Sequence, residues 1–115
     1  MNPLFHISFY KFVRLSDPAS VAVQVRELAT KHRLEGLIDV ASEGISAAVS
    51  GASDALDEFE RELTADAFLS NGTVGAFNGM VFKRTACKSK PFHSLKVSHV
   101  AELIKIGLDE ETNKA

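Results

Sequence analysis

The chain has 115 residues, of which 45% are hydrophobic and 24% are charged, with a formal net charge of −2. This length suits one domain with a single core, and no apolar run reaches the roughly 18 residues that a membrane span needs. The N-terminus lacks the residue order of a signal peptide, and the single cysteine, Cys87, excludes an internal disulfide. We therefore expect a soluble cytoplasmic domain without a membrane segment.

The charges are segregated along the chain. Six acids and one arginine lie between Asp54 and Asp66, whereas residues 67–101 contain no acid. That acid-free stretch carries the basic residues and histidines Lys83, Arg84, Lys88, Lys90, His93, Lys96 and His99. The pattern predicts that one face of the domain is basic although the whole chain is acidic.

The first half of the chain predicts a strand followed by a helix. Residues 4–13 alternate with the period of a strand and carry apolar side chains on both sides, which is typical of a central strand, and we expect Phe9 and Phe12 in the core. Asp17 and Pro18 suit a helix start, and the helix should run to about His32. Its buried stripe is predicted by the spacing of Val21, Val25, Leu28 and Ala29.

A hairpin and a second helix are predicted next. Gly36 should end the first helical segment, and residues 37–41 and 45–50 read as two strands joined by a turn at Glu43-Gly44. The second helix opens near Ser53 and has an apolar face made of Leu56, Phe59 and Leu63.

The last third of the chain has weaker patterns. Residues 80–83 are the best candidates for a fourth strand, residues 85–91 resemble an exposed connection, and residues 92–97 suit a short returning strand. Residues 101–106 are expected to form a helical turn.

The order of these elements predicts an α+β fold, a ferredoxin-like βαββαβ sandwich in which a four-stranded antiparallel sheet carries two helices on one face. The other face of that sheet is expected to be partly open. We expect one domain over residues 1–107 and a polar C-terminal tail over residues 108–115.

Three blocks of sequence resemble a known family. They are Phe9-Tyr10-Lys11-Phe12 with Asp17-Pro18; Gly36-Leu37-Ile38 with the run from Val40 to Ile45 and Val49-Ser50-Gly51; and Phe82-Lys83 with Pro91-Phe92, Leu95-Lys96-Val97 and Glu102-Leu103-Ile104 to Gly107. Together they resemble the N-terminal, acylphosphatase-like domain of the rhodanese-domain tRNA uridine hydroxylases. The resemblance implies a helper domain that grips substrate, since the catalytic cysteine of that family belongs to a downstream rhodanese domain.

The sequence also departs from the family pattern. Ser46, Ala47 and Ala48 stand where the family usually has Asn-Gly-Thr, and Ser98 stands where an arginine is usual. A basic residue expected at the interface is therefore missing, and Cys87 does not fall in the catalytic cysteine motif.

The leading hypothesis is that the chain binds RNA, with tRNA as the partner that the resemblance implies. Lysine and arginine neutralise phosphates, and Phe92 or His93 can stack on a base, as can an aromatic platform at Tyr10 and Phe12. The candidate phosphate contacts are Lys83, Arg84, Lys88, Lys90, Lys96 and Arg14. The same lysines also suit a solvated edge strand without any ligand.

Two other functions remain open. The chain can be a protein-interaction module that docks on a rhodanese or other catalytic domain, in cis or in trans, or on itself. It can also be an acylphosphatase-like hydrolase, because Arg14 follows the first strand, although the phosphate-cradling glycines are missing and Asp17 repels anions. Cys87 lies near cations that favour a thiolate but has no readable base. The pattern predicts no catalytic residue, no metal site and no cofactor, and it does not predict the oligomeric state.

Overall fold

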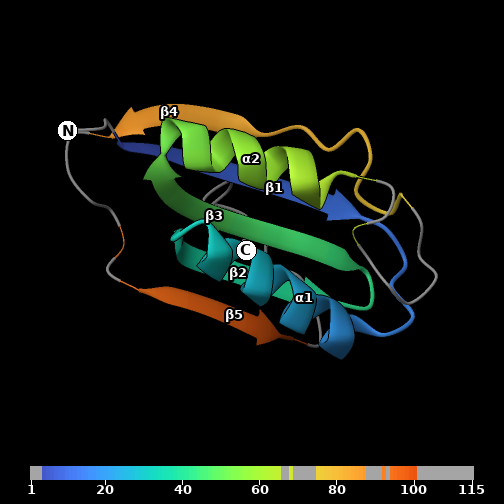
Figure 1. The fold of residues 1–115 in the computed structure, drawn as a ribbon. Coiled ribbons are helices and arrows are strands. Elements are labelled where there is room, and N and C mark those ends of the chain that lie inside the picture. Colours follow the sequence, from blue (N-terminus) through green and yellow to red (C-terminus); the bar gives the residue numbers. More distant parts are fainter. Residues whose placement is uncertain (1–3, 66–67, 69–74, 88–91, 93, 101–115) are drawn as a thin grey trace, which may run out of the picture.

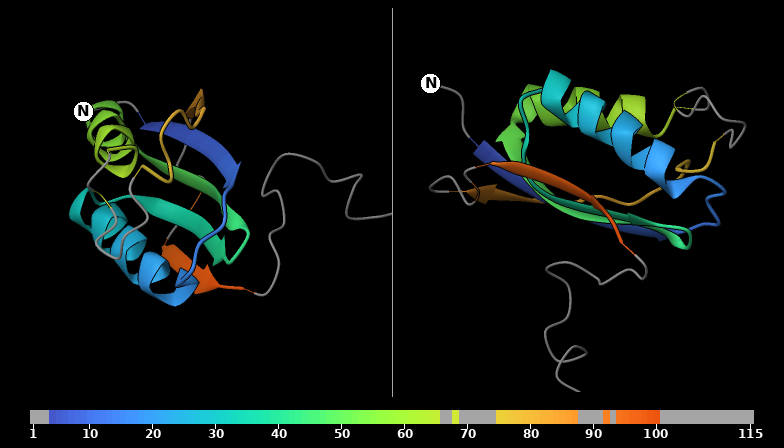
Figure 2. Two further views of the ribbon diagram at one scale, coloured as in Figure 1. Left: turned by 90° about the vertical axis from the view of Figure 1, so that its right-hand side faces the viewer. Right: turned by 90° about the horizontal axis from the view of Figure 1, so that it is seen from below.

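A computed structural model describes residues 4–65, 68, 75–87, 92 and 94–100. In chain order these residues form β1 (Leu4–Phe12), α1 (Pro18–Lys31), β2 (Glu35–Ala41), β3 (Gly44–Ala52), α2 (Ser53–Leu63), β4 (Lys83–Cys87) and β5 (Leu95–His99). The five strands form one sheet in the order β4-β1-β3-β2-β5. Both helices pack on one face of this sheet, which confirms the α+β sandwich (Figure 1, Figure 2).

The sheet differs from the expected four antiparallel strands. The pairs β1–β3, β1–β4 and β2–β3 are antiparallel, but β5 is a fifth strand that runs parallel to β2. Backbone hydrogen bonds from Gly36 N to Ser94 O (2.9 Å) and from Val100 N to Val40 O (2.8 Å) extend this ladder at both ends. The sequence indicated a short strand near residues 92–97 but not its neighbour, because a five-residue edge strand carries no pattern that identifies its partner.

The fourth strand lies later in the chain than expected. Residues 80–82 are irregular, with Met80 buried and Val81 80% exposed, and β4 begins only at Lys83. It continues through Cys87, within the stretch that suggested an exposed connection. Three of its five side chains are exposed, so backbone pairing with β1, rather than a hydrophobic pattern, defines this edge strand.

Both helices match their predicted positions and faces. The side chain of Asp17 accepts a hydrogen bond from Ser20 N at 3.2 Å and caps α1, with Pro18 as its first residue. The predicted stripe of α1 and all three predicted residues of α2 are buried against the sheet. Each large apolar side chain buried in this way stabilises the fold by about 1.5–3 kcal/mol relative to exposure.

Several expectations fall outside the described residues. These are the helical turn over residues 101–106, the tail over residues 108–115 and the region that contains Lys88, Lys90 and His93. The domain boundary at residue 107 therefore stays a prediction. Within the described part of the chain, no helix combines the length and apolar character that a membrane crossing requires.

Candidate nucleic-acid interface

The sheet face opposite the helices holds the candidate site, and we call it the outer face. It is defined by the even-numbered residues of β1 and β3, the odd-numbered residues of β2 and β4, and Lys96 and Ser98 of β5. This assignment follows from the pairing register, since side chains alternate along a strand and paired residues share a face. Figure 2 shows the two helices together on the opposite face.

Two aromatic side chains are exposed on the outer face. Tyr10 is 40% exposed and Phe12 is 56% exposed, with ring centroids 5.6 Å apart in an edge-on arrangement. The expectation that Phe12 is buried was therefore wrong, whereas Phe9 is buried as expected. Phe9 points to the helices and contacts Phe59 of α2, with ring centroids 6.1 Å apart. Residues 9 and 12 lie on opposite faces of β1, and the helices cover only one of them.

Lys83 and Lys96 share the outer face at its two edges. Both are exposed, and a single row across the sheet joins them through Ser8, Ala48 and Leu37. Four strand spacings separate their backbones, which corresponds to about 19 Å. The structure therefore places two of the predicted phosphate contacts on the same face of the sheet, with the buried residues Ser8 and Ala48 in the row between them.

Arg84 points to the other side of the sheet. Its guanidinium lies 2.9 Å from a Glu60 carboxylate oxygen and 3.0 Å from one of Asp57, both on α2. The hydrogen bond to Glu60 is the main reason that the pKa of Arg84 is raised. Arg84 thus joins β4 to α2 and is not brought together with Lys83 and Lys96.

The two ends of the lysine row differ in their surroundings. Asp39 and Glu35 of β2 also belong to the outer face, and Asp39 is a near neighbour of Lys96. Burial raises the pKa of Asp39, while the charge of Lys96 opposes that rise. The β5 side of the outer face therefore carries compensating charges, and the β4 side is the more basic.

A groove lies beside the second half of β1, on the basic side. It has a volume of about 430 Å³, and its lining consists of Ser8, Phe9, Tyr10, Lys11, Gly79, Met80, Val81 and Lys83. β4 pairs with β1 only from Leu4 to Ser8, so the chain before Lys83 diverges from β1 and leaves this space. Sequence reasoning missed Ser8, Met80 and Val81, and the only signal was the turn at Asn78-Gly79.

Arg14 lies apart from the lysine row. It is exposed and lines a hollow of about 390 Å³ together with Glu43 in the turn between β2 and β3. In the same loop, Val13 N donates to Glu43 O at 3.0 Å and Leu15 N donates to Ser42 O at 2.8 Å. These two amides are used inside the fold, so they do not form a phosphate cradle of the kind that an acylphosphatase needs.

The cysteine and the histidines form no reactive cluster among the described residues. Cys87 is partly buried at the end of β4, where its thiol makes a weak 4.0 Å contact with Thr85 O. His6 stacks on Phe92 with ring centroids 6.0 Å apart, and burial lowers the pKa of His6. His32 contacts Glu62 at 2.8 Å. Among the residues that the structure describes, no three His, Cys, Asp or Glu side chains gather as metal ligands would.

Comparison with known proteins identifies the family. Residues 5–103 match the UPF0176 acylphosphatase like domain. The chain belongs to this family. This UPF0176 domain is 32% identical over 105 residues to a tRNA uridine(34) hydroxylase of Listeria welshimeri, and 33% identical over 107 residues to one of Xanthomonas euvesicatoria. The matches cover 91% and 93% of this chain but only 30% and 40% of those relatives. The UPF0176 domain thus corresponds to their N-terminal part, which confirms the resemblance found in the sequence.

Solved structures of low sequence identity support the fold alone. The BLUF protein BlrB in its dark state superposes with a TM-score of 0.63 at 16% identity, covering 88% of this UPF0176 domain and 74% of that chain. Acylphosphatase from Bacillus subtilis superposes with a TM-score of 0.52 at 15% identity, covering 86% and 99%. Both likenesses agree with the α+β sandwich of Figure 1.

Proposed function

We propose that this UPF0176 domain is an accessory RNA-binding domain that holds tRNA on the outer face of its sheet. The observation that carries the proposal is the exposure of Lys83 on the same face as Tyr10 and Phe12. Lysines contribute affinity for phosphates, and aromatic rings on a sheet stack on unpaired bases. The names of the relatives support tRNA as the RNA.

In this proposal, the catalytic chemistry of the relatives belongs to the part of their chains that lies outside the matched region. This UPF0176 domain spans 30% to 41% of the length of curated relatives such as those of Listeria welshimeri and Bordetella parapertussis. Its described residues bring together no nucleophile with a base and no set of metal ligands. In this account the domain positions tRNA for a rhodanese-type catalytic domain, supplied in cis or in trans.

Titration of the full chain with tRNA at several salt concentrations tests the proposal. We expect affinity to fall as salt rises, because bound lysines release counterions from phosphates. Lys83→Gln should reduce the slope of log K against log salt by about 0.7–0.9, the value for one phosphate contact. Lys96→Gln should reduce the slope less, since the neighbouring Asp39 already offsets the charge of Lys96.

Arg33→Gln is the matched control, because Arg33 is an exposed cation that follows α1 and lies outside the outer face. It should leave the salt slope unchanged. The proposal fails if tRNA does not bind at low salt, or if Lys83→Gln and Arg33→Gln change the slope equally.

A second function is favoured by the apolar side chains of the outer face. Phe12 is 56% exposed and Leu37 is 40% exposed, as expected for a surface that docks on another protein domain. The tRNA titration separates the two functions. Absence of RNA binding together with capture of a separately supplied rhodanese domain would favour docking.

A further inference from the structure

We propose that the groove beside β1 is a nucleobase subsite, in which an unpaired base stacks on Tyr10 while its phosphate lies at Lys83. This inference rests on the proposed function, because it specifies which RNA element the outer face takes. β4 leaves β1 after Ser8, and the chain from Gly79 to Lys83 forms the second wall of the groove.

The chemistry of the lining suits a flat apolar group that carries a negative charge. Tyr10 and Val81 supply exposed aromatic and apolar surface, and the buried Phe9 and Met80 also belong to the lining. Lys83 and Lys11 supply two cations, and no acid is found among the described residues that line the groove. The Lys11 ammonium donates one hydrogen bond to Asn78 O at 2.9 Å, and an ammonium has three hydrogens to donate.

Two other hollows of the described chain lack this combination. The hollow of about 610 Å³ near the start of α2 includes Glu35 and Asp54, and the hollow beside Arg14 includes Glu43. Each of these linings combines at least one carboxylate with a cation, Arg33 in the first hollow and Arg14 in the second. Charge complementarity therefore favours the groove beside β1 over these two hollows for an anionic ligand.

The size and exposure of the groove suit a nucleobase from an unpaired RNA segment. A volume of about 430 Å³ lies in the range of roughly 300–1,000 Å³ that small-ligand pockets have. Tyr10 exposes 40% of its surface to solvent, beside the ring of Phe12. A base inside a duplex is covered on both faces by its neighbours, whereas an unpaired base can enter the groove.

The composition of the chain provides a local probe of this subsite. Tyr10 is the only tyrosine and the chain has no tryptophan, so tyrosine emission reports on Tyr10 alone. A five-nucleotide uridine RNA, which forms no internal pairs, should quench this emission on titration. A ribose-phosphate chain of equal length that lacks bases should bind weakly through its phosphates and leave the emission unchanged.

Substitutions test the role of the ring independently of fluorescence. Tyr10→Leu should weaken binding of the labelled uridine RNA by roughly 5- to 150-fold, the range for loss of one stacked base, whereas Tyr10→Phe should bind within about twofold of the natural chain. Val81→Asp, which places an acid in the groove, should also weaken binding. Val23→Asp is its matched control, because Val23 is a 47% exposed valine of α1.

The outcomes separate this inference from the proposed function. Salt-dependent binding of tRNA, combined with unchanged Tyr10 emission and a Tyr10→Leu variant that binds like the natural chain, would overturn the nucleobase subsite alone. Equal effects of Val81→Asp and Val23→Asp would also overturn it. Absence of any RNA binding at low salt would refute the proposed function itself.

Discussion

Gly36 shows how a single residue allows the two central strands to approach. It lies in β2 with a φ of +142°, and a Cβ placed there would come within 2.2 Å of Ala48 O in β3. Both the backbone conformation and the distance exclude a larger residue. The sequence suggested that Gly36 ends the first helix. In the structure α1 ends at Lys31, and Arg33 after it takes the left-handed conformation with a φ of +58°.

We therefore predict that Gly36→Ala lowers the free energy of unfolding by about 2–4 kcal/mol, through backbone strain and a clash with β3. Gly79→Ala is the matched control, because Gly79 also has a positive φ, +73°, but no atom within 4 Å of its Cβ position. It should cost only about 1–2 kcal/mol. Urea unfolding of both variants measures the difference, and equal losses would contradict the close-approach argument.

The residues of the candidate site could be predicted only in part. Alternation along β1 placed Tyr10 and Phe12 on one side and Phe9 on the other. It did not show which side the helices cover, since both sides carry aromatic residues. Similarly, Lys83 and Arg84 are sequence neighbours with the same charge. Their separation onto opposite faces follows from the alternation of side chains along β4, which begins later in the chain than the sequence suggested.

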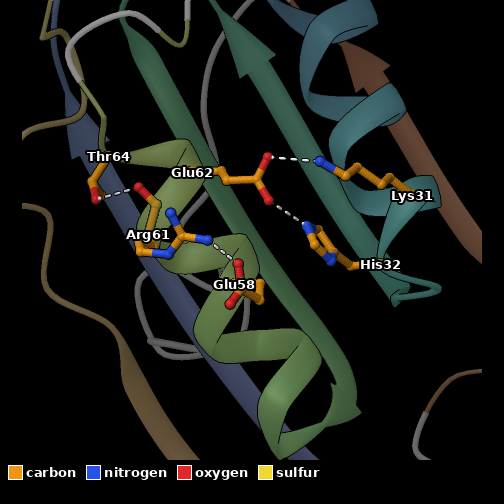
Figure 3. Close-up of polar contacts among 6 residues, drawn as sticks. All are labelled: Lys31, His32, Glu58, Arg61, Glu62 and Thr64. Atoms are coloured by element: carbon orange, nitrogen blue, oxygen red, sulfur yellow. Dashed lines mark hydrogen bonds and ion pairs between the residues drawn. The ribbon is translucent and has the colours of Figure 1, made fainter.

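At the scale of elements, a charged cluster joins the two helices near their C-terminal ends. The carboxylate of Glu62 on α2 contacts Lys31 Nζ at 2.9 Å and His32 Nε2 at 2.8 Å (Figure 3). The hydrogen bonds from Lys31 and His32 lower the pKa of Glu62 below its usual value of 4.5. A carboxyl group with a lowered pKa in the folded state stabilises the fold once it is ionised.

The cluster predicts a defined dependence of stability on pH. The contribution of Glu62 should be fully present above its unfolded pKa of about 4.5 and lost as pH falls through its lower folded pKa. Glu62→Gln should therefore be less stable than the natural chain near neutral pH, by less than about 1 kcal/mol for this partly exposed cluster. The difference should disappear at strongly acidic pH.

Thermal unfolding across this pH range measures the effect. Glu58→Gln is the matched control, since Glu58 pairs with Arg61 within α2 and does not join the helices (Figure 3). Glu58→Gln should lose stability at acidic pH to the same extent as the natural chain, because it retains Glu62. A stability difference between Glu62→Gln and the natural chain that persists unchanged into strong acid would contradict the role of the Glu62 carboxylate.

The helices were more predictable than the edge strands for a physical reason. Each helix has a cap or a start signal and an apolar stripe with helical spacing, and these local features sufficed for α1 and α2. β4 and β5 are five residues long and contain at most one buried residue each, so their positions depend on backbone pairing with β1 and β2. Pairing between distant segments leaves no periodic pattern in either one.

At the scale of the whole molecule, the two faces of the sheet have different roles. One face binds both helices and forms the core, with Ile7, Phe9 and Phe59 buried within it. The outer face carries exposed aromatic side chains with a basic β4 side and a charge-compensated β5 side. In this proposal, the helix-covered face of the sheet stabilises the fold and the outer face binds RNA.

Mapping RNA contacts by NMR tests this division most directly. Amide resonances of the labelled full chain are followed while the uridine pentamer is added at low salt. We predict that the largest shifts occur on β1 and in the segment from Gly79 to Lys83, with smaller shifts near Lys96 and little change in α1 and α2. Largest shifts on the helices, or saturation of binding without changes at Tyr10 and Lys83, would contradict the assignment of RNA binding to the outer face.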